Sequence, residues 1–411
     1  MMDLKLRKIV GWFSVFIFLG AFLFVGLAQA ASPTTTIAVG GSPSGLAVTP
    51  DGKYVYVPNG EDVAVIDTAS SKVVARVAVG GWPFSGLAVS HSGEYVYVLN
   101  RGLNGEGFVS VISVDTNTVI STIMQGIMPS EVIVSPDGKY VYVLSSEHLE
   151  IEELLFSSFG VVSVISTATH AVLSNISTGR YAYAGLAVSP DGAYFYVSGV
   201  TGLLHVVDSS LEAEIASIKL GEKVSLGRVV VSFDGKYVYV LGNEAVFVVS
   251  TKSNTVVATV SDLGYPSDLA LSPDGKYVYV TEAGRDVVSA INTSTYCVDF
   301  SVDAGRSPRV VVVSPDGGCL YVSNSYTGSS DGKVSFVKLD SSVGSSGIGG
   351  NLSVVWWLLV VGGCVIVVAV IVFIVVMRIK RKPKQPVSVN SDVESTNLTA
   401  FCLIPQYSPF V

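Results

Sequence analysis

The sequence predicts an all-β fold, and within that class a seven-bladed β-propeller. Three observations lead there: a nine-residue element recurs seven times, strand-like runs surround each copy, and the one missing strand occurs at the other end of the domain. The first copy, TPDGKYVYV, begins at Thr49, and the others follow at intervals of 41, 45, 54, 43, 40 and 42 residues. A unit of about 40 residues with four antiparallel strands is typical of a propeller blade. The later copies begin at Ser90, Ser135, Ser189, Ser232, Ser272 and Ser314.

Each blade is expected to contain four strands, A to D, as the first copy illustrates. Val, Ile and Tyr dominate four runs in which apolar and polar residues nearly alternate, and turn residues separate the runs. The Asp-Gly pair between the first two runs is a strong hairpin signal, because Gly accepts positive φ and Asp bonds to its own turn backbone. The four runs are Gly45–Thr49, Lys53–Pro58, Asp62–Asp67 and Lys72–Val79.

The last copy lacks a D strand. Its three predicted strands lie near Val310–Val313, Leu320–Ser323 and Lys333–Leu339, and a Gly/Ser-rich linker over 341–353 follows them. The run Thr34–Val39, followed by Gly-Gly-Ser-Pro, matches the step from strand D to the next strand A in other blades. We therefore expect this N-terminal strand to close the last blade, which removes open sheet edges.

The N-terminal segment 1–30 has the three parts of a secretory signal peptide. Three basic residues come first, a long apolar run follows, and Ala28-Gln29-Ala30 supplies the small residues of a cleavage site. We expect cleavage near Ala30. Because the apolar run is long for a signal peptide, an uncleaved anchor is the alternative. The propeller domain then spans residues 31–340.

Residues 354–377 are predicted to form a transmembrane α-helix. These 24 residues carry no charge, and at about 1.5 Å of rise per residue they span a hydrocarbon core of roughly 30 Å. Trp356 and Trp357 lie near one end, and five basic residues follow the other end, where the positive-inside rule places the cytoplasm. The sequence therefore predicts an extracellular propeller, a single-pass anchor in the cell membrane and a short cytoplasmic tail over 378–411.

The predicted extracellular part is acidic. Residues 1–30 hold three basic and one acidic residue, and residues 351–411 hold five and two. Taking these from totals of 25 basic and 33 acidic residues leaves 17 and 30, a net charge of −13. Such a surface repels phosphate backbones, so we expect no nucleic-acid partner.

The end of strand B resembles the YVTN β-propeller repeat family. The resemblance rests on a Tyr-Val-x-(Asn/Glu) step after the (Ser/Thr)-x-(Asp/Ser)-Gly turn, and it covers about residues 34–340. Blades four and five depart from the pattern at Gly199 and Gly242. Because this family occurs in archaeal surface-layer and other exported proteins, the resemblance implies an exported propeller, and it implies little about activity. The clearest steps are Tyr56–Asn59, Tyr97–Asn100, Tyr279–Glu282 and Tyr321–Asn324.

The B–C and D–A connections of a propeller share one face around the central channel, and ligands usually bind there. The longest is the B–C connection of blade three at 145–160, predicted as a short amphipathic helix over the channel or as a solvated excursion packed on its blade. Aromatic and arginine side chains in the D–A connections suit recognition of a sugar or peptide, and a wedge between blades is the alternative for Trp82 and Tyr265. The candidate ligand-face residues are Trp82, Met128, Glu147, His148, Glu150, Tyr181, Tyr265 and Arg306.

Two cysteines and three sequons fall in the predicted extracellular part. Cys297 and Cys319 either form a single disulfide or are two buried small side chains. The sequons predict N-glycosylation at Asn175 and Asn292, in or beside C–D turns and away from the ligand face, and at Asn351 next to the membrane.

The sequence predicts no metal site, no cofactor and no catalytic centre. The four histidines fall on different faces, nucleophile-elbow, haem-attachment and phosphate-loop motifs are missing, and the repeated turn aspartates lack a calcium-ligand pattern. We therefore expect a non-catalytic surface protein for adhesion, envelope assembly or capture of an envelope glycan or protein. An exported enzyme, lactonase-like or quinone-dependent, and a receptor that signals through the tail are the alternatives.

Overall fold

The computed structural model describes residues 35–339, with gaps at 103–105, 128, 152–154, 183, 222–223 and 326–331. Strands make up the regular secondary structure of this part of the chain, and it contains no helix long and apolar enough to cross a membrane. The predicted signal peptide, linker, transmembrane helix and tail lie outside the described residues.

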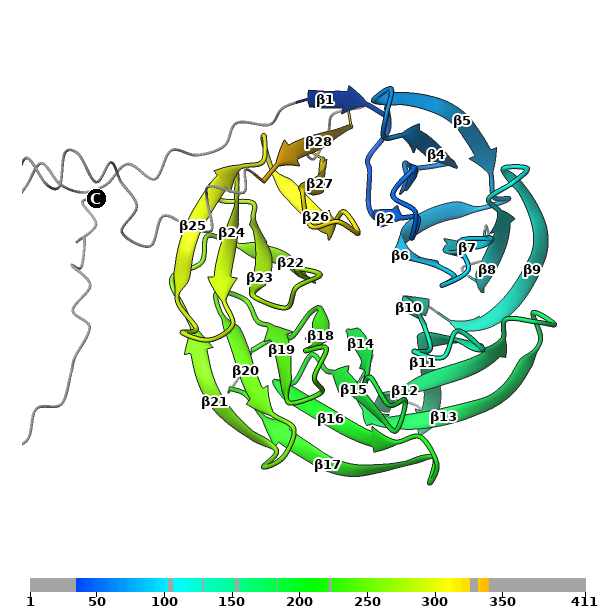
Figure 1. Ribbon diagram of the computed structural model, residues 1–411. Coiled ribbons are helices and arrows are strands. Elements are labelled where there is room, and N and C mark those ends of the chain that lie inside the picture. The colour runs from blue at the N-terminus through cyan, green and yellow to red at the C-terminus, as the bar shows by residue number, and fades with distance from the viewer. Residues whose placement is uncertain are drawn as a thin grey trace, which may run out of the picture. The chain divides into compact units, whose positions relative to one another are not determined.

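Seven four-stranded antiparallel sheets stand around a central axis, as Figure 1 shows, which confirms the prediction of a seven-bladed propeller. Blade one consists of β2 (Ala47–Val48), β3 (Tyr54–Pro58), β4 (Asp62–Asp67) and β5 (Lys72–Ala78). Blade two consists of β6 (Trp82–Val89), β7 (Tyr95–Arg101), β8 (Glu106–Ser113) and β9 (Thr118–Ile127). Blade three consists of β10 (Pro129–Val134), β11 (Tyr140–Ile151), β12 (Leu155–Ser166) and β13 (Val172–Arg180).

The remaining four blades repeat this order from the innermost strand outwards. Blade four consists of β14 (Gly185–Val188), β15 (Tyr194–Ser198), β16 (Leu203–Asp208) and β17 (Ala213–Lys219). Blade five consists of β18 (Val229–Val231), β19 (Tyr237–Leu241), β20 (Val246–Ser250) and β21 (Thr255–Val260). Blade six consists of β22 (Pro266–Leu271), β23 (Tyr277–Glu282), β24 (Val287–Asn292) and β25 (Val298–Asp303). Blade seven consists of β26 (Pro308–Val313), β27 (Cys319–Asn324), β28 (Lys333–Lys338) and β1 (Thr35–Ala38).

Blade seven is closed by the first strand of the domain, as predicted. β1 pairs antiparallel with β28, and Ile37 lies opposite Val334 in this register. Figure 1 shows the two strands side by side, although they come from opposite ends of the domain. Since both ends of the domain belong to one sheet, their pairing closes the ring and covers the outer edge of β28.

The hydrophobic core consists of seven clusters, and each lies between two neighbouring blades. The cluster between blades seven and one, for example, joins Ile37 and Phe336 to Val55 and Ile66. Strands B and C of each blade are almost fully buried, because each sheet packs face to face on the next. Every blade is therefore stabilised by both of its neighbours.

The repeated Ser/Thr-x-Asp-Gly element forms a hydrogen-bonded A–B turn. In blade one, Thr49 Oγ1 donates to Asp51 Oδ1 at 2.7 Å, and the backbone NH of Lys53 donates to the same oxygen at 3.1 Å. Gly52 has φ +72°, a conformation that glycine adopts without steric cost. Thr68 Oγ1 from the C–D turn donates to the Gly52 carbonyl at 2.7 Å and so ties the two turns together. The same Ser–Asp contact occurs in blades three to seven, which supports turn stabilisation as the role of these aspartates.

We expect these turns to make the propeller sensitive to acid. The hydrogen bond from Thr49 lowers the pKa of Asp51 from 3.8 to about 2. Because the folded-state pKa is the lower one, the stabilisation is present above about pH 4 and is lost as the pH falls towards about 2. Replacing four such aspartates by Asn should reduce the pH slope of the free energy of unfolding in this range, measured by urea denaturation; an unchanged slope contradicts the expectation. The four are Asp51, Asp137, Asp234 and Asp274, each with a pKa of about 2.

The amphipathic helix predicted within 145–160 is wrong. β11 and β12 continue as a long hairpin, with Glu147 opposite Phe159 and His148 opposite Ser158. The pairing starts in the buried part of blade three and keeps its register outwards, so alternate backbone groups of each strand pair across the hairpin. Continuation of the strands therefore outweighs the helical spacing of the apolar residues.

The disulfide predicted between Cys297 and Cys319 is also wrong, because both are free thiols. Cys297 is exposed just before β25, the outermost strand of blade six, whereas Cys319 is half-buried at the start of β27 in blade seven. The alternative of two buried side chains fails as well, since Cys297 is exposed.

Candidate functional site

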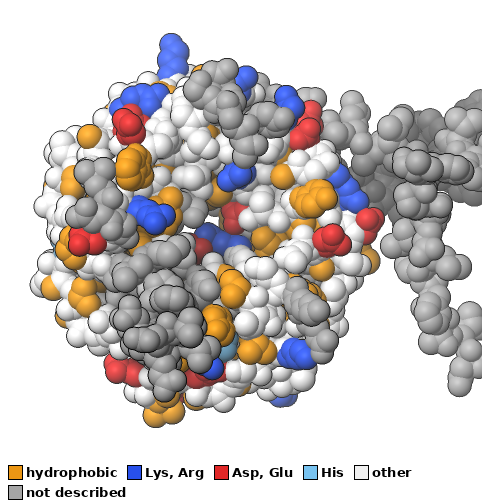
Figure 2. Space-filling view, turned by 180° about the vertical axis from the view of Figure 1, so that it is seen from behind, with side chains coloured by type: hydrophobic (Ala, Val, Ile, Leu, Met, Phe, Trp, Pro, Cys, Tyr) orange, Lys and Arg blue, Asp and Glu red, His pale blue; other side chains and the backbone are white. Residues whose placement is uncertain are grey.

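The innermost strands bring three charged side chains into the central channel. Four residues before the Ser or Thr that opens each A–B turn, blades three, five and six carry Glu131, Arg228 and Asp268. Glu131 lies in β10, Asp268 lies in β22, and Arg228 directly precedes β18. Figure 2 shows basic and acidic side chains inside the hollow at the centre of the ring. The other blades carry Gly45, Gly86, Gly185 and Val310 at this position.

Arg228 joins the two carboxylates across the channel. Its Nη1 donates to both oxygens of Glu131 at 2.8 Å, and its Nε lies 3.5 Å from Asp268 Oδ1. Asp268 Oδ2 accepts the backbone NH of Val311, in the A strand of blade seven, at 3.0 Å. Glu131 and Asp268 are only 6% and 5% exposed, whereas 34% of the Arg228 side chain is accessible. The cluster therefore links the A strands of four blades and leaves part of Arg228 open to a ligand.

Burial governs the protonation of this channel cluster. Loss of water around the ionised carboxylates raises the pKa of Glu131 and of Asp268. The charge of Glu131, with a smaller contribution from Asp268, raises the pKa of Arg228, so the guanidinium stays protonated. Arg228 is thus the group that compensates two carboxylates which burial alone would neutralise.

Our predictions from the sequence missed this cluster, although the sequence contains a signal for it. The A strands of blades one, two and four read Gly-Leu-Ala-Val, and the Gly is replaced by a charged residue in blades three, five and six. This position holds Gly in three of the other blades and Val in the fourth, so the repeat itself does not call for a charge there, and an alignment of the seven A strands would have revealed the cluster.

Two exposed aromatic rings lie on the face of the B–C and D–A connections. Trp82 begins β6, pairs with Arg101 and is 48% exposed, and Tyr265 directly precedes β22 and is 74% exposed. The Tyr265 ring lies over Gly284, where an added Cβ would come within 2.7 Å of the ring. Tyr265 also borders a cleft of about 520 Å³ beside Glu244. Such exposure argues against a wedge between blades for either ring.

Tyr181 and Arg306 belong to the D–A connections that lead into blades four and seven. Tyr181 has φ +58°, and its ring centroid lies 6.0 Å from the guanidinium carbon of Arg180. The same guanidinium lies 5.9 Å from the Phe159 ring, so cation–π contacts tie the long hairpin of blade three to this connection. Arg306 is exposed, and its carbonyl accepts a hydrogen bond from Asn324 Nδ2 at 3.2 Å. These candidates share a face with the two exposed rings but come from separate blades.

Several predicted site residues are not described in full. Met128 and Asn351 lie outside the described residues, and for Glu147, His148 and Glu150 the backbone alone is described. Within the described part of the chain, no three His, Cys, Asp or Glu side chains gather into a set that could hold a metal ion.

Comparison with known proteins agrees with this architecture. No family model matches the chain. The seven-bladed β-propeller protein Rv1057 of Mycobacterium tuberculosis is 32% identical over 115 residues, which make up 27% of this chain. The chain is a seven-bladed β-propeller. The match spans only 29% of the length of that relative, so what the relative does is not carried over to this chain.

Solved structures show the same fold. Hydrazine synthase of Kuenenia stuttgartiensis superimposes with a TM-score of 0.63 and 22% identity over 77% of this chain and 99% of that one. The β-propeller domain of Cps50 (Swd1) from Myceliophteria thermophila superimposes with a TM-score of 0.58 and 10% identity, over 74% of this chain and 100% of that one. At such identities the likeness concerns the fold alone.

Two predicted glycosylation sites lie in the outer part of the propeller. Asn175 is exposed in β13, and its Oδ1 accepts a hydrogen bond from Ser163 Oγ at 2.8 Å. Asn292 ends β24 at a C–D turn, and its Nδ2 donates to Asp299 Oδ2 at 2.8 Å. A glycan on Asn292 would leave that nitrogen with a single N–H, whereas Asn175 would keep its contact through Oδ1.

Proposed function

We propose that this chain is a membrane-anchored cell-surface propeller that captures an envelope glycan or protein at its channel mouth without catalysis. The anchor and its orientation rest on the sequence, where the uncharged segment 354–377 precedes a basic cluster. A closed ring of seven blades supports this role, because it holds ligand-contacting residues on a rigid scaffold.

The observation that carries the proposal is the pair of exposed rings at the mouth, Trp82 and Tyr265. Aromatic rings of this kind stack on sugar faces and contribute strongly to protein interfaces. In the channel, both carboxylates already have Arg228 as their partner. Carboxylates held in this way are better suited to contacting a ligand than to transferring a proton. We therefore favour binding over catalysis.

Binding of soluble envelope glycans to variants of the full chain tests the proposal. Each variant lacks one of the two rings. Trp82→Ala and Tyr265→Ala should each weaken glycan binding by about tenfold or more, measured by calorimetry. Their thermal midpoints should stay unchanged because both rings are exposed. Gly284→Ala should weaken binding as well, since it displaces the Tyr265 ring without removing it.

Phe233→Ala is the matched control for these variants. Phe233 is an aromatic side chain 61% exposed in the A–B turn of blade five, on the opposite face of the ring. It should leave glycan binding unchanged. Equal losses in Phe233→Ala and Trp82→Ala, or full binding by both mouth variants, would contradict the proposed mouth site.

An exported hydrolase or dehydrogenase is the second candidate. It is favoured by one observation, the two buried carboxylates with raised pKa on either side of Arg228, since acid–base catalysts are tuned in this way. Lactone hydrolysis that disappears in Glu131→Gln and persists in Trp82→Ala would support this alternative. Absence of turnover by the intact chain would leave the binding role in place.

A further inference from the structure

On the face opposite the mouth, the clefts between neighbouring blades are filled to different extents. The C–D turns of blades one to six each contain a non-glycine residue with positive φ, and in the turn of blade two this residue bonds to the B-strand tyrosine of the preceding blade. Between blades one and two, Tyr56 OH donates to Asn117 Oδ1 at 2.9 Å, and Asn117 has φ +51°. Between blades three and four the corresponding residues are Tyr142 and Glu212, which also has φ +51°. No hydrogen bond joins this second pair among the described contacts.

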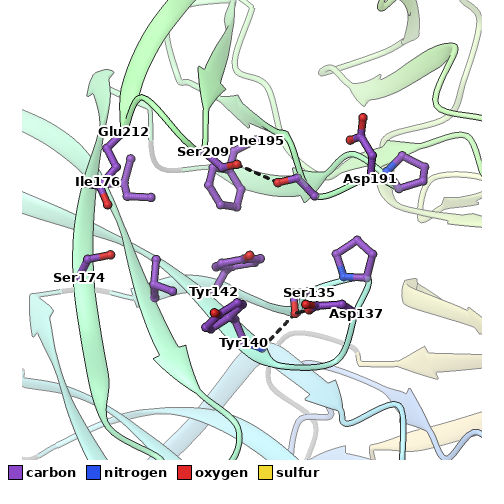
Figure 3. Close-up of a pocket in the computed structure, with 14 residues that line it drawn as sticks. Ser135, Asp137, Tyr140, Tyr142, Ser174, Ile176, Asp191, Phe195, Ser209 and Glu212 are labelled. Carbon is purple, nitrogen blue, oxygen red and sulfur yellow. Dashed lines mark hydrogen bonds between the residues drawn. The ribbon is translucent and has the colours of Figure 1, made fainter.

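A cleft of about 520 Å³ opens between blades three and four, as Figure 3 shows. Tyr142 and Phe195 meet edge to face at its floor, with ring centroids 4.7 Å apart. Tyr142 is only 7% exposed, and its hydroxyl, which is not among the fully enclosed polar atoms, makes no hydrogen bond to the described residues and borders the cleft. Tyr140, Ser174 and Ser209 add a ring and two hydroxyls to the lining. The floor therefore offers aromatic faces and one unpaired hydroxyl.

The rim of this cleft carries negative charge without an equal number of basic partners. Asp137 pairs with Lys139 at 3.2 Å. In blade four the equivalent of that lysine is Ala193, and Asp191 bonds only within its own turn, through Oδ1. These turn bonds lower the pKa of Asp191, so its carboxylate is ionised at neutral pH. Glu212 is exposed at the same cleft, and no Lys or Arg is among the described lining residues.

We propose that this cleft is a second binding site, for a ligand that carries a protonated amine. The aromatic floor attracts an ammonium group and packs against its carbon chain. Asp191 and Glu212 compensate its charge at the rim, and the Tyr142 hydroxyl accepts an N–H hydrogen bond at the floor. This site is independent of the mouth proposed above, because it lies on the face of the A–B and C–D turns.

The cleft between blades seven and one provides a comparison within the same ring. Its volume is similar, about 560 Å³, and Asp316 lies in its wall without a lysine two residues later. Ser71 occupies the positive-φ position there, and Lys338 is among the lining residues. A basic lining residue disfavours a second cation, so we do not assign amine binding to the cleft between blades seven and one.

Calorimetric titration of the full chain with diaminopentane and with pentanediol tests the site. The two probes have the same carbon chain and differ in charge, so the diamine should bind at least about tenfold more tightly. Tyr142→Phe keeps the ring and removes the hydroxyl, and it should weaken diamine binding roughly threefold. Asp191→Asn and Glu212→Gln should each have a similar, roughly threefold effect, as expected for exposed ion pairs. Asp316→Asn, in the comparison cleft, should have none.

A short lysine peptide and its Nε-acetylated form identify the source of the amine. Tighter binding of the unmodified peptide than of diaminopentane indicates a protein side chain, and weaker binding indicates a free small amine; both support the site. Equal binding of diol and diamine, or an equal loss in Asp316→Asn and Asp191→Asn, would overturn the proposal. So would the absence of binding by both the diamine and the unmodified peptide. Each outcome is distinct from the glycan test, which uses other residues.

Discussion

A chain that lacks residues 31–40 is expected to lose the whole propeller fold and not merely the edge of blade seven. The deletion removes β1, the strand that covers the outer edge of β28. It also removes Ile37 and Val39 from the cluster between blades seven and one. Since every blade is packed on both neighbours, an open ring exposes two sheet faces at once. We expect the cooperative thermal transition of the intact chain to be abolished.

Single substitutions in β1 separate the effect of closure from the effect of a shorter chain. Ile37 is 6% exposed and points into the cluster, whereas the neighbouring Thr36 is exposed on the same strand. Ile37→Asp should lower the free energy of unfolding by roughly 3 to 5 kcal/mol, because a buried methyl-rich side chain becomes an unpaired charge. Thr36→Asp should change it by less than about 1 kcal/mol. Urea denaturation of both variants measures the difference.

An unchanged melting curve for the deletion variant would rule out this closure. Equal destabilisation by Ile37→Asp and Thr36→Asp would also contradict the closure. It would mean that the buried face of β1 contributes no more to stability than the exposed face. A partial loss confined to one transition, with a second transition retained, would show that blades one to six fold without the seventh.

The success of the sequence in predicting this closure has a physical cause. The position of a strand can be predicted from local sequence patterns, because alternation, Asp-Gly turns and the spacing between copies are all properties of short segments. The missing strand of blade seven was found because Thr34–Val39 carries the same local pattern as the D strands. The strands of blade one were predicted to within two residues at each end for the same reason.

The channel cluster was not predicted because it depends on contacts between distant segments, and the hairpin of blade three was not predicted because it continues a register set in the buried part of its blade. Glu131 and Arg228 are 97 residues apart, and only closure of the ring brings them within 2.8 Å. The region 145–160 carries a helical spacing of apolar residues, yet the register of the buried strands extends into it. In both places tertiary structure outweighs the local signal.

Arg228→Met is expected to lower the free energy of unfolding substantially. It removes the charge that compensates Glu131 and Asp268, both nearly fully buried, and keeps much of the side-chain volume. Breaking a buried ion pair on one side costs about 3 to 5 kcal/mol, and we expect the lower end because a third of Arg228 is accessible. Arg76→Met is the control: Arg76 pairs with the partly exposed Asp62 and donates to the Val39 carbonyl, which keeps a second donor in Asn59, so the substitution should cost about 1 kcal/mol.

The stability lost in Arg228→Met should be larger at neutral pH than at acid pH. Burial places the folded-state pKa of Glu131 and Asp268 above their usual values of 4.5 and 3.8. A carboxyl with a raised folded-state pKa binds its proton more tightly in the folded state, so stability is highest at acid pH and falls as the pH rises through that pKa. Without Arg228, backbone hydrogen bonds are all that remains to offset the effect of burial on these two pKa values. The variant should therefore approach the stability of the intact chain as the solution is acidified, and fall behind it towards neutral pH.

Neutral replacements of the carboxylates decide whether this explanation holds. Adding Glu131→Gln and Asp268→Asn to Arg228→Met should recover much of the lost stability at neutral pH, because no unpaired charge is left in the channel. It should also remove the extra pH dependence. If the triple variant is as unstable as Arg228→Met at every pH, the arginine acts through its packing and its hydrogen bonds, and the charge balance of the channel is not what holds the A strands of blades three, five and six together.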